Sequence, residues 1–417
     1  MNVKKVLLLM SCILMLCTVT VFGFTDVDEN SEYYEAVNYM YENGIIGGYG
    51  DDTFRPNNPI SYNELAVILT KSSDSYEKYL TVFDLPHPHW ATSYLIFVRT
   101  QGWLNVSEMH YGNAEDCMQP IPKSIALRGI FGMYGLEFYN YRFYEKDVAD
   151  IEECISEDGQ NAVMFAYELG LIDVDEENKL GVNNNITRGE VCQIIYDLKK
   201  IKDTEGLKVT VPDIIKDLNI VYKEEMSDSN KIFVINELAW FPVEIIKEFN
   251  ERNWTLYITN KSLLDAYTGD YFPELRSAVG LCDYENKEIW VSYTWLINIT
   301  TTIMHEFGHF VEYVYCDNPK DRTAIYDLYH TEKNGLSEYC SRDYCETSKT
   351  EFFAEAFRNF TAYAYYLDIP EKDEGYQKLA PKTYEFFKEL FMEIDKDFKE
   401  KVENQMAEEE ITNELEG

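Results

Sequence analysis

The residues best suited to chemistry lie in TTIMHEFGHFVEY, residues 300–312. This segment holds His305 and His309, two of the six histidines in the chain, with Glu306 directly after the first. Residues four apart lie on one face of a helix, so both imidazoles can bind one metal ion. Glu306 lies about 100° round the helix, where it reaches the attacking water without binding the ion. This arrangement is typical of a zinc-dependent hydrolase in which Glu306 is the general base.

Two structural histidines on a buried helix are the alternative explanation. A chance occurrence of this spacing is rare in a chain so poor in histidine, on the order of one in a hundred. Gly308 favours the functional interpretation, because glycine inside a helix costs about 1 kcal/mol relative to alanine. We expect a helix that keeps this glycine to be approached closely by another segment there.

A zinc site requires a third protein ligand and an open fourth position. The downstream candidates are His330, Glu351 and Glu355. The two glutamates lie four residues apart in TEFFAEAFRNF, within a mostly apolar predicted helix. A metal and a histidine N–H would offset the cost of burying both carboxylates. The alternative for them is a solvated acidic stripe. His330 lies in YHTEKNG, which we interpret as a loop, and is the weaker candidate.

Three segments together, HEFGH, EFFAEAF and APKTYEFF, resemble the catalytic domain of the anthrax lethal factor family of metallopeptidases. The resemblance covers residues 210–395, and the small secreted Pro-Pro endopeptidases are the most similar branch. It implies one Zn²⁺ per chain, bound by His305, His309 and Glu351, with Glu306 as general base. It also implies a zincin-type domain, substrates that are proteins or peptides, and a preference for proline-rich sequences.

The resemblance assigns roles to further residues. Tyr344, in SRDYCETSKTEFF, would donate a hydrogen bond to the tetrahedral oxyanion, and Tyr339 is the nearby alternative. Glu355 would contact a ligating histidine. The strand KEIWVSY would be the edge strand that aligns the substrate backbone, and its Trp290 would stack on a substrate proline ring. A half-buried surface aromatic is the other interpretation of Trp290.

The elements that position these residues indicate an α+β domain with a mixed sheet, which we place at residues 213–397. We predict helices at VEIIKEFNERN, TTTIMHEFGHFVEYVY, TEFFAEAFRNFTAYAYYL and TYEFFKELFMEI, and a strand at WTLYIT. SAVGLC and KEIWVSY are predicted strands that form a hairpin across DYEN. Residues 398–417 form an acidic tail, which we predict to be a frayed or solvated helix.

The N-terminal part of the chain contains internal repeats. Residues 24–71 hold two predicted helices, the second with Ser61 as N-cap and Glu64 three residues later. Parts of this pattern recur within residues 82–104, 146–173 and 183–198. One repeat cannot bury its own apolar face, so three copies are expected to pack together.

These repeats resemble three S-layer homology modules, an all-α unit placed at residues 24–71, 82–136 (degenerate) and 144–200, with a linker at 201–212. The resemblance implies binding to anionic cell-wall polysaccharide. Its polymer-binding signature matches Ile-Thr-Arg-Gly-Glu at residues 186–190, which assigns Thr187 and Arg188 to the polymer. The second repeat has only Lys123 in place of the arginine. Alternatively, the repeats only pack against each other.

The N-terminal segment and the overall charge indicate where the protein is found and which partners it has. MNVKKVLLLMSCILMLCTVTVFG, residues 1–23, has the basic start and apolar run of a secretory signal peptide, with an uncleaved anchor as the alternative. Acidic residues outnumber basic ones 74 to 37, which argues against nucleic acid as a partner. We therefore predict a secreted zinc endopeptidase attached to the cell wall or S-layer. The alternatives are a non-catalytic surface protein with a protease-like domain, and a cell-wall amidase.

Overall fold

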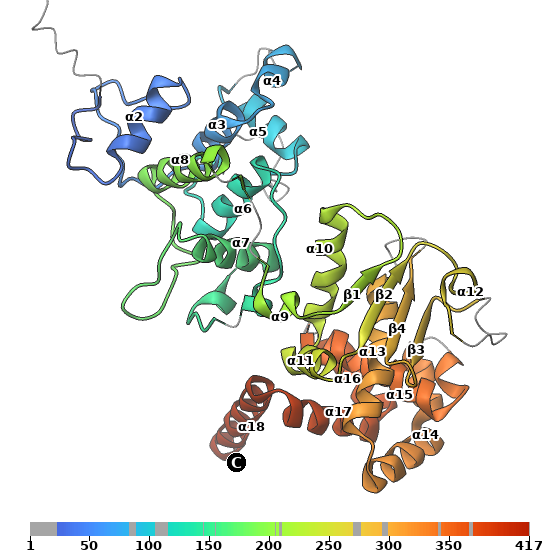
Figure 1. Ribbon diagram of the computed structural model, residues 1–417. Coiled ribbons are helices and arrows are strands. Elements are labelled where there is room, and N and C mark those ends of the chain that lie inside the picture. Colours follow the sequence, from blue (N-terminus) through green and yellow to red (C-terminus); the bar gives the residue numbers. More distant parts are fainter. Residues whose placement is uncertain are drawn as a thin grey trace, which may run out of the picture. The chain divides into compact units, whose positions relative to one another are not determined.

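The computed structural model describes residues 23–82, 89–104, 116–144, 146–154, 156–204, 206–207, 211–269, 277–293, 299–340, 343–366 and 370–416. The chain separates into two compact units. Unit 1 comprises Met1–Phe138 with Lys146–Thr210, and unit 2 comprises Tyr139–Glu145 with Val211–Gly417 (Figure 1). The expected signal peptide lies outside the described residues except for its last one. Within the described ranges, no helix has both the length and the apolar character needed to span a bilayer.

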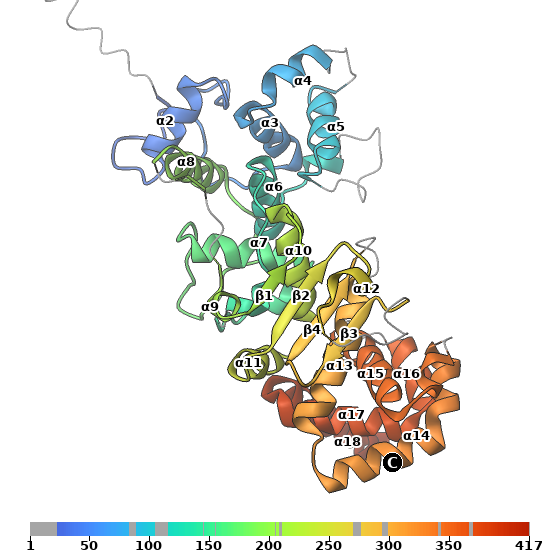
Figure 2. The same ribbon diagram turned by 45° about the vertical axis from the view of Figure 1, so that its right-hand side comes forward.

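Unit 1 is built from three pairs of helices. They are α2 (Tyr34–Glu42) with α3 (Tyr62–Ser72), α5 (Thr92–Thr100) with α6 (Lys123–Met133), and α7 (Glu157–Glu168) with α8 (Arg188–Thr204), while α4 (Tyr76–Val82) follows α3. The first helix of each pair packs on the second helix of another, as α5 on α3, α7 on α6 and α2 on α8. Both views show α2 beside α8 (Figure 1, Figure 2). The three repeats therefore pack together, as predicted, in a closed ring.

The ring closes through three equivalent isoleucines just before the second helices. The Ile60 N–H donates to the Ile186 carbonyl at 3.0 Å, Ile186 to Ile121 at 3.1 Å, and Ile121 to Ile60 at 3.0 Å. All three side chains are fully buried. The degenerate second repeat thus occupies a place equivalent to those of the other two. Helix α8 also continues into the segment that we had expected to be a linker.

Unit 2 contains a four-stranded mixed sheet with the order β1-β2-β4-β3. The strands β1 (Ile220–Tyr222), β2 (Thr255–Thr259) and β4 (Glu288–Ser292) are parallel, and β3 (Gly280–Asp283) is antiparallel to β4. The predicted hairpin is confirmed. One expectation was wrong: β4, the KEIWVSY strand, lies between β2 and β3, so the strand at this edge of the sheet is β3.

The helices of unit 2 pack on the sheet and on one another. Helix α13 (Ile299–Tyr315) packs on β3 and β4, and α15 (Lys349–Asn359) packs on α13. The remaining helices are α9 (Asp213–Lys216), α10 (Asp228–Asn236), α11 (Val243–Glu251), α12 (Leu263–Ala266), α14 (Pro319–Cys340), α16 (Pro370–Leu379), α17 (Pro381–Ile394), α18 (Lys396–Glu416) and the π-helix η8 (Phe360–Tyr366).

One segment differs from its expected form, and a second agrees with its expected helical form except at its start. His330, placed in a loop from the sequence, lies in α14, whose buried side chains are few and include Glu332. So polar a helix has a weak apolar period, which explains the error. The acidic tail lies within α18, and its first residue, Phe398, packs on Phe391 with ring centroids 6.2 Å apart. The start of the tail is therefore part of the packed domain.

Candidate active site

The site is positioned by a close approach of α13 and α15. Helix α13 turns Ile303, Phe307 and Phe310 into the core, and all three are fully buried. A Cβ atom added at Gly308 would lie 2.8 Å from the Ala354 Cα. Only glycine permits this contact between the helices, as expected from its place in HEFGH. The contact brings the glutamates of α15 to the histidines of α13.

Three donor atoms converge where the helices meet. Glu351 Oε2 lies 3.0 Å from His305 Nε2 and 3.6 Å from His309 Nε2. Ligand atoms of these three residues all lie within 4.8 Å of one another. A tetrahedral zinc with ligands at about 2.0–2.2 Å separates its donors by about 3.3–3.6 Å, so the group fits zinc. His330 is not part of this group; its ring lies against Tyr326, 4.3 Å away between centroids.

Carboxylates on both sides control the charge of His305. Its Nδ1 lies 3.0 Å from Glu355 Oε1, opposite the contact with Glu351. Burial alone would lower the pKa of His305, but the hydrogen bonds with Glu351 and Glu355 raise that pKa to about 9. Burial opposes ionisation of Glu351, yet the two histidines hold its pKa well below the usual range. Without a metal, a proton on His305 thus takes the place of the positive ion.

Glu306 lies between α13 and the edge strand. It is 6% exposed, and burial raises its pKa although the neighbouring histidines oppose this effect. A Cβ at Gly280 in β3 would lie 2.1 Å from Glu306 Oε1. Gly280 therefore allows the edge strand to pass directly over the expected general base. Our sequence interpretation missed this residue, although a glycine within a strand signals a close approach.

Tyr344 lies beside the converging side chains of His305 and Glu351. Its ring centroid lies 5.7 Å from that of His305, and the residue is 43% exposed. Burial of its hydroxyl and the nearby Glu351 carboxylate raise the pKa of Tyr344 to about 12, so the hydroxyl keeps its proton at neutral pH. The alternative, Tyr339, instead stacks on Tyr376 with centroids 5.0 Å apart.

Trp290 is a packing residue, contrary to our expectation. It is 1% exposed. Its ring stacks on Tyr257 at 4.1 Å between centroids and meets Tyr267 edge-on at 5.6 Å. The indole N–H donates to Glu288 Oε2 at 2.8 Å. Because aromatic rings cover it, Trp290 has no free face for a substrate proline.

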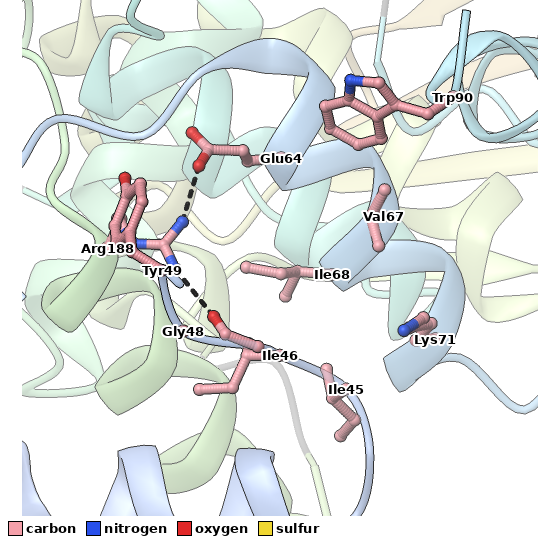
Figure 3. Close-up of a pocket in the computed structure, with 11 residues that line it drawn as sticks. Ile45, Ile46, Gly48, Tyr49, Glu64, Val67, Ile68, Lys71, Trp90 and Arg188 are labelled. Atoms are coloured by element: carbon pink, nitrogen blue, oxygen red, sulfur yellow. Dashed lines mark hydrogen bonds and ion pairs between the residues drawn. The ribbon is translucent and has the colours of Figure 1, made fainter. Parts of the chain in front are cut away.

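Arg188 in unit 1 is also committed to internal contacts (Figure 3). It is 6% exposed, and its Nη1 lies 2.6 Å from Glu64 Oε1. Its Nε donates to the Phe54 carbonyl at 3.1 Å, and its Nη2 to the Gly47 carbonyl at 3.2 Å. The guanidinium that we expected to bind the polymer therefore joins the third repeat to the first.

Thr187 and Lys123, the other residues matched to the signature, also make hydrogen bonds within unit 1. Thr187 caps α8, because its Oγ1 accepts from the Glu190 N–H at 3.2 Å and its own N–H donates to Glu190 Oε2 at 2.7 Å. Lys123, the substitute in the second repeat, donates to the Leu180 carbonyl at 3.1 Å. Arg188 also lines a cavity of about 220 Å³, whose wall includes Trp90, Lys71, Tyr49 and Glu64. Trp90, in the wall of this cavity, is 60% exposed.

Comparison with known proteins fits this geometry. Residues 23–66 and 155–192 match the S-layer homology domain, and residues 200–390 match the family described as anthrax toxin lethal factor, N- and C-terminal domain. The chain thus joins S-layer homology repeats to a lethal factor-like domain of a peptidase-related family, as the sequence resemblance predicted.

One solved structure with a similar chain is that of the Pro-Pro endopeptidase PPEP-2 from Paenibacillus alvei. It shows 20% identity over 43% of this chain and 99% of that chain, with a TM-score of 0.32. None of the curated proteins compared matches the sequence.

Proposed function

We propose that this protein is a secreted zinc endopeptidase that S-layer homology repeats hold at the bacterial cell wall. The observation that carries the proposal is the convergence of His305, His309 and Glu351 beside Glu306, in a lethal factor-like domain. A non-catalytic surface protein would have no need for a buried base, three converging ligands and a protonated tyrosine at one place.

His305, His309 and Glu351 would hold one Zn²⁺ per chain. When bound, this ion supplies Lewis-acid polarisation of the scissile carbonyl and lowers the pKa of water. Glu306 takes a proton from the water that attacks the carbonyl carbon, and then delivers it to the leaving nitrogen as the C–N bond breaks. The Tyr344 hydroxyl donates a hydrogen bond to the oxyanion that develops on the carbonyl oxygen.

The edge strand β3 gives the substrate a place to align. Its outer side has no partner strand among the described residues, and Gly280 brings it against Glu306. An extended peptide paired with β3 would therefore pass the general base. We propose cleavage next to proline, between two prolines in surface proteins, on the sequence resemblance alone. A prolyl nitrogen has no N–H, so the residues around it must supply the pairing.

Unit 1 would bind the wall polymer through the cavity beside Arg188. Protein and polymer are both acidic, so long-range attraction cannot provide the affinity, and short-range contacts must. Trp90 offers a ring for stacking and Lys71 a cation. The test is co-sedimentation of the protein with purified cell-wall sacculi. A wild-type protein that stays in the supernatant would make unit 1 a folded spacer.

The enzymatic proposal is tested by metal analysis together with digestion of a proline-containing peptide library. We expect about one zinc per chain, and we expect Glu351→Ala to lose zinc far more readily than Glu355→Ala. Peptides should be cleaved by the wild type and left intact by Glu306→Ala. Zinc release in His330→Ala but not in Glu351→Ala would show that the ligand set is wrong. Zinc binding without any cleavage would favour the non-catalytic alternative.

A further inference from the structure

Glu355 is held on both sides at the base of the proposed metal site. Its side chain is 1% exposed, and Oε1 lies 3.0 Å from His305 Nδ1. Its other oxygen, Oε2, lies 2.7 Å from Arg358 Nη2, on a side chain that is 12% exposed. Arg358, Glu355 and His305 thus form a buried chain of charged and polar groups that ends at the proposed metal ligands.

The second histidine has no such support. His309 Nδ1 is buried without a hydrogen-bond partner among the described residues. The outer nitrogen of a metal-binding histidine is normally held by a carboxylate or carbonyl, which fixes the ring and its tautomer. Of the two histidines, it is His305 whose outer nitrogen is held in this way, by Glu355. The geometry of the site therefore depends on the residue that keeps Glu355 in place.

We propose that Arg358 is a positioning residue for the zinc site. This inference rests on the proposed function, because it presumes that His305 binds a metal. A buried carboxylate is stable only when its charge is compensated, and the N–H of a neutral imidazole does not supply a charge. Arg358 supplies it through the ion pair with Oε2. Oε1 then stays directed at His305 Nδ1, and His305 Nε2 stays directed at the proposed metal.

An ordinary helix ion pair is the competing explanation, because Glu355 and Arg358 lie three residues apart on α15. The chain offers a matched example, Arg252 with Glu248, at 2.7 Å and with side chains 46% and 34% exposed. Exposed pairs of that kind contribute little. The Glu355–Arg358 pair differs in its burial and in its contact with a proposed ligand, so the two arginines can be compared directly.

The experiment measures the zinc dissociation constant of the full-length protein by competition with a chromogenic chelator. Arg358→Met should weaken zinc binding by about 10–100-fold, the usual effect of losing such a partner. Arg358→Lys keeps the charge but loses the planar fork, and should weaken it by less. Arg252→Met should leave it unchanged. Thermal unfolding of each metal-free variant identifies any that fail to fold. If Arg358→Met is one of them, the zinc dissociation constant of Arg358→Lys is compared with that of the wild type instead.

A double-mutant cycle separates positioning from a general loss of stability. Glu355→Gln should itself weaken zinc binding, and adding Arg358→Met to it should weaken binding by less than about threefold more. The absorption spectrum of the Co²⁺-substituted protein should change in both single variants, because the ligand geometry changes.

Three outcomes would overturn the inference: a zinc dissociation constant in Arg358→Met within about twofold of wild type, full additivity with Glu355→Gln, or a wild type that binds no zinc. Failure of the proposed function is distinguishable. If the wild type binds zinc and shows this coupling but cleaves no peptide, the positioning role of Arg358 is supported and the proposed peptidase activity is wrong.

Discussion

The two units use buried charged groups in opposite ways. In unit 1, Arg188 is surrounded by the Glu64 carboxylate and two carbonyl oxygens, so its hydrogen-bonding capacity holds the repeats together. In unit 2, ligand atoms of His305, His309 and Glu351 converge on one point. The raised pKa of His305 means that this residue carries a proton when no metal is bound. The comparison shows that a signature residue indicates binding only when its polar atoms are not already used by the fold.

The largest effect should come from the expected base of unit 2. Glu306→Gln keeps the shape of the side chain but cannot accept the proton from water, so kcat should fall by about 10²–10⁴-fold. Zinc content should stay at the wild-type level, because Glu306 is not one of the converging donors. Peptide-cleavage kinetics and metal analysis of the same sample provide the measurement. Loss of zinc would instead make Glu306 a ligand.

The next largest effect concerns Arg188. Removing one partner of a buried ion pair costs about 3–5 kcal/mol, and the Glu64 side chain is 29% exposed, so we expect about 3 kcal/mol for Arg188→Met. Chemical denaturation should show the loss in unit 1 only. Arg188 lines the cavity but is only 6% exposed, so polymer binding per folded molecule should change less than stability does.

The opposite result for Arg188→Met, normal stability with lost polymer binding, would remove the contrast between the units. Lys71→Met is the matched comparison, because Lys71 also lines the cavity but is only partly buried. We expect this variant to weaken polymer binding with little loss of stability.

Tyr344→Phe should lower kcat by about 10²-fold, the effect of removing one oxyanion donor. Zinc affinity and unfolding temperature should match the wild type. Tyr339→Phe is the control, since Tyr339 stacks on Tyr376, and should turn over normally. If the two variants exchange these results, the oxyanion role belongs to Tyr339.

The last prediction concerns the pH dependence of metal binding. The pKa of His305 is raised from 6.5 to about 9, so the metal-free site is protonated at pH 7, and zinc must displace that proton. Zinc affinity should therefore rise about tenfold per pH unit between about pH 7 and 9 and then level off. The same shift stabilises the metal-free fold below pH 6.5, and this stabilisation is lost as pH rises through 9.

Calorimetry in buffers of different ionisation enthalpy checks this prediction, because about one proton per zinc should be released at pH 7. A binding constant that does not change between pH 7 and 9 would contradict the environment described for His305.

Local patterns predicted much of the geometry of the candidate site. The four-residue spacings place His305 over His309 and Glu351 over Glu355, and Gly308 indicated where the two helices touch. DYEN predicted the hairpin of β3 and β4. These features depend on neighbours in sequence or on one glycine, so the residues themselves carry the information.

Long-range contacts decided what the sequence could not predict. Strand β1 is three residues long, too short to show a period, and β4 becomes internal only because β2 and β3 pair on either side of it. The burial of Trp290 depends on two tyrosines from other segments. The partners of Arg188 lie in the first repeat, more than 120 residues earlier in the chain.

The ring of repeats in unit 1 has a consequence for the order in which the protein is made. Helix α2 is covered by α8, and the hydrogen bonds of Ile60, Ile121 and Ile186 close only when all three are present. In an open solenoid each repeat can settle on the previous one as it emerges. Here the first repeat cannot complete its packing until the last repeat has been synthesised, which takes roughly 10–30 s at ordinary rates of synthesis. Because its contacts are distant in sequence, the segment folds late, and an unfolded chain at that stage is compatible with the secretion that we propose.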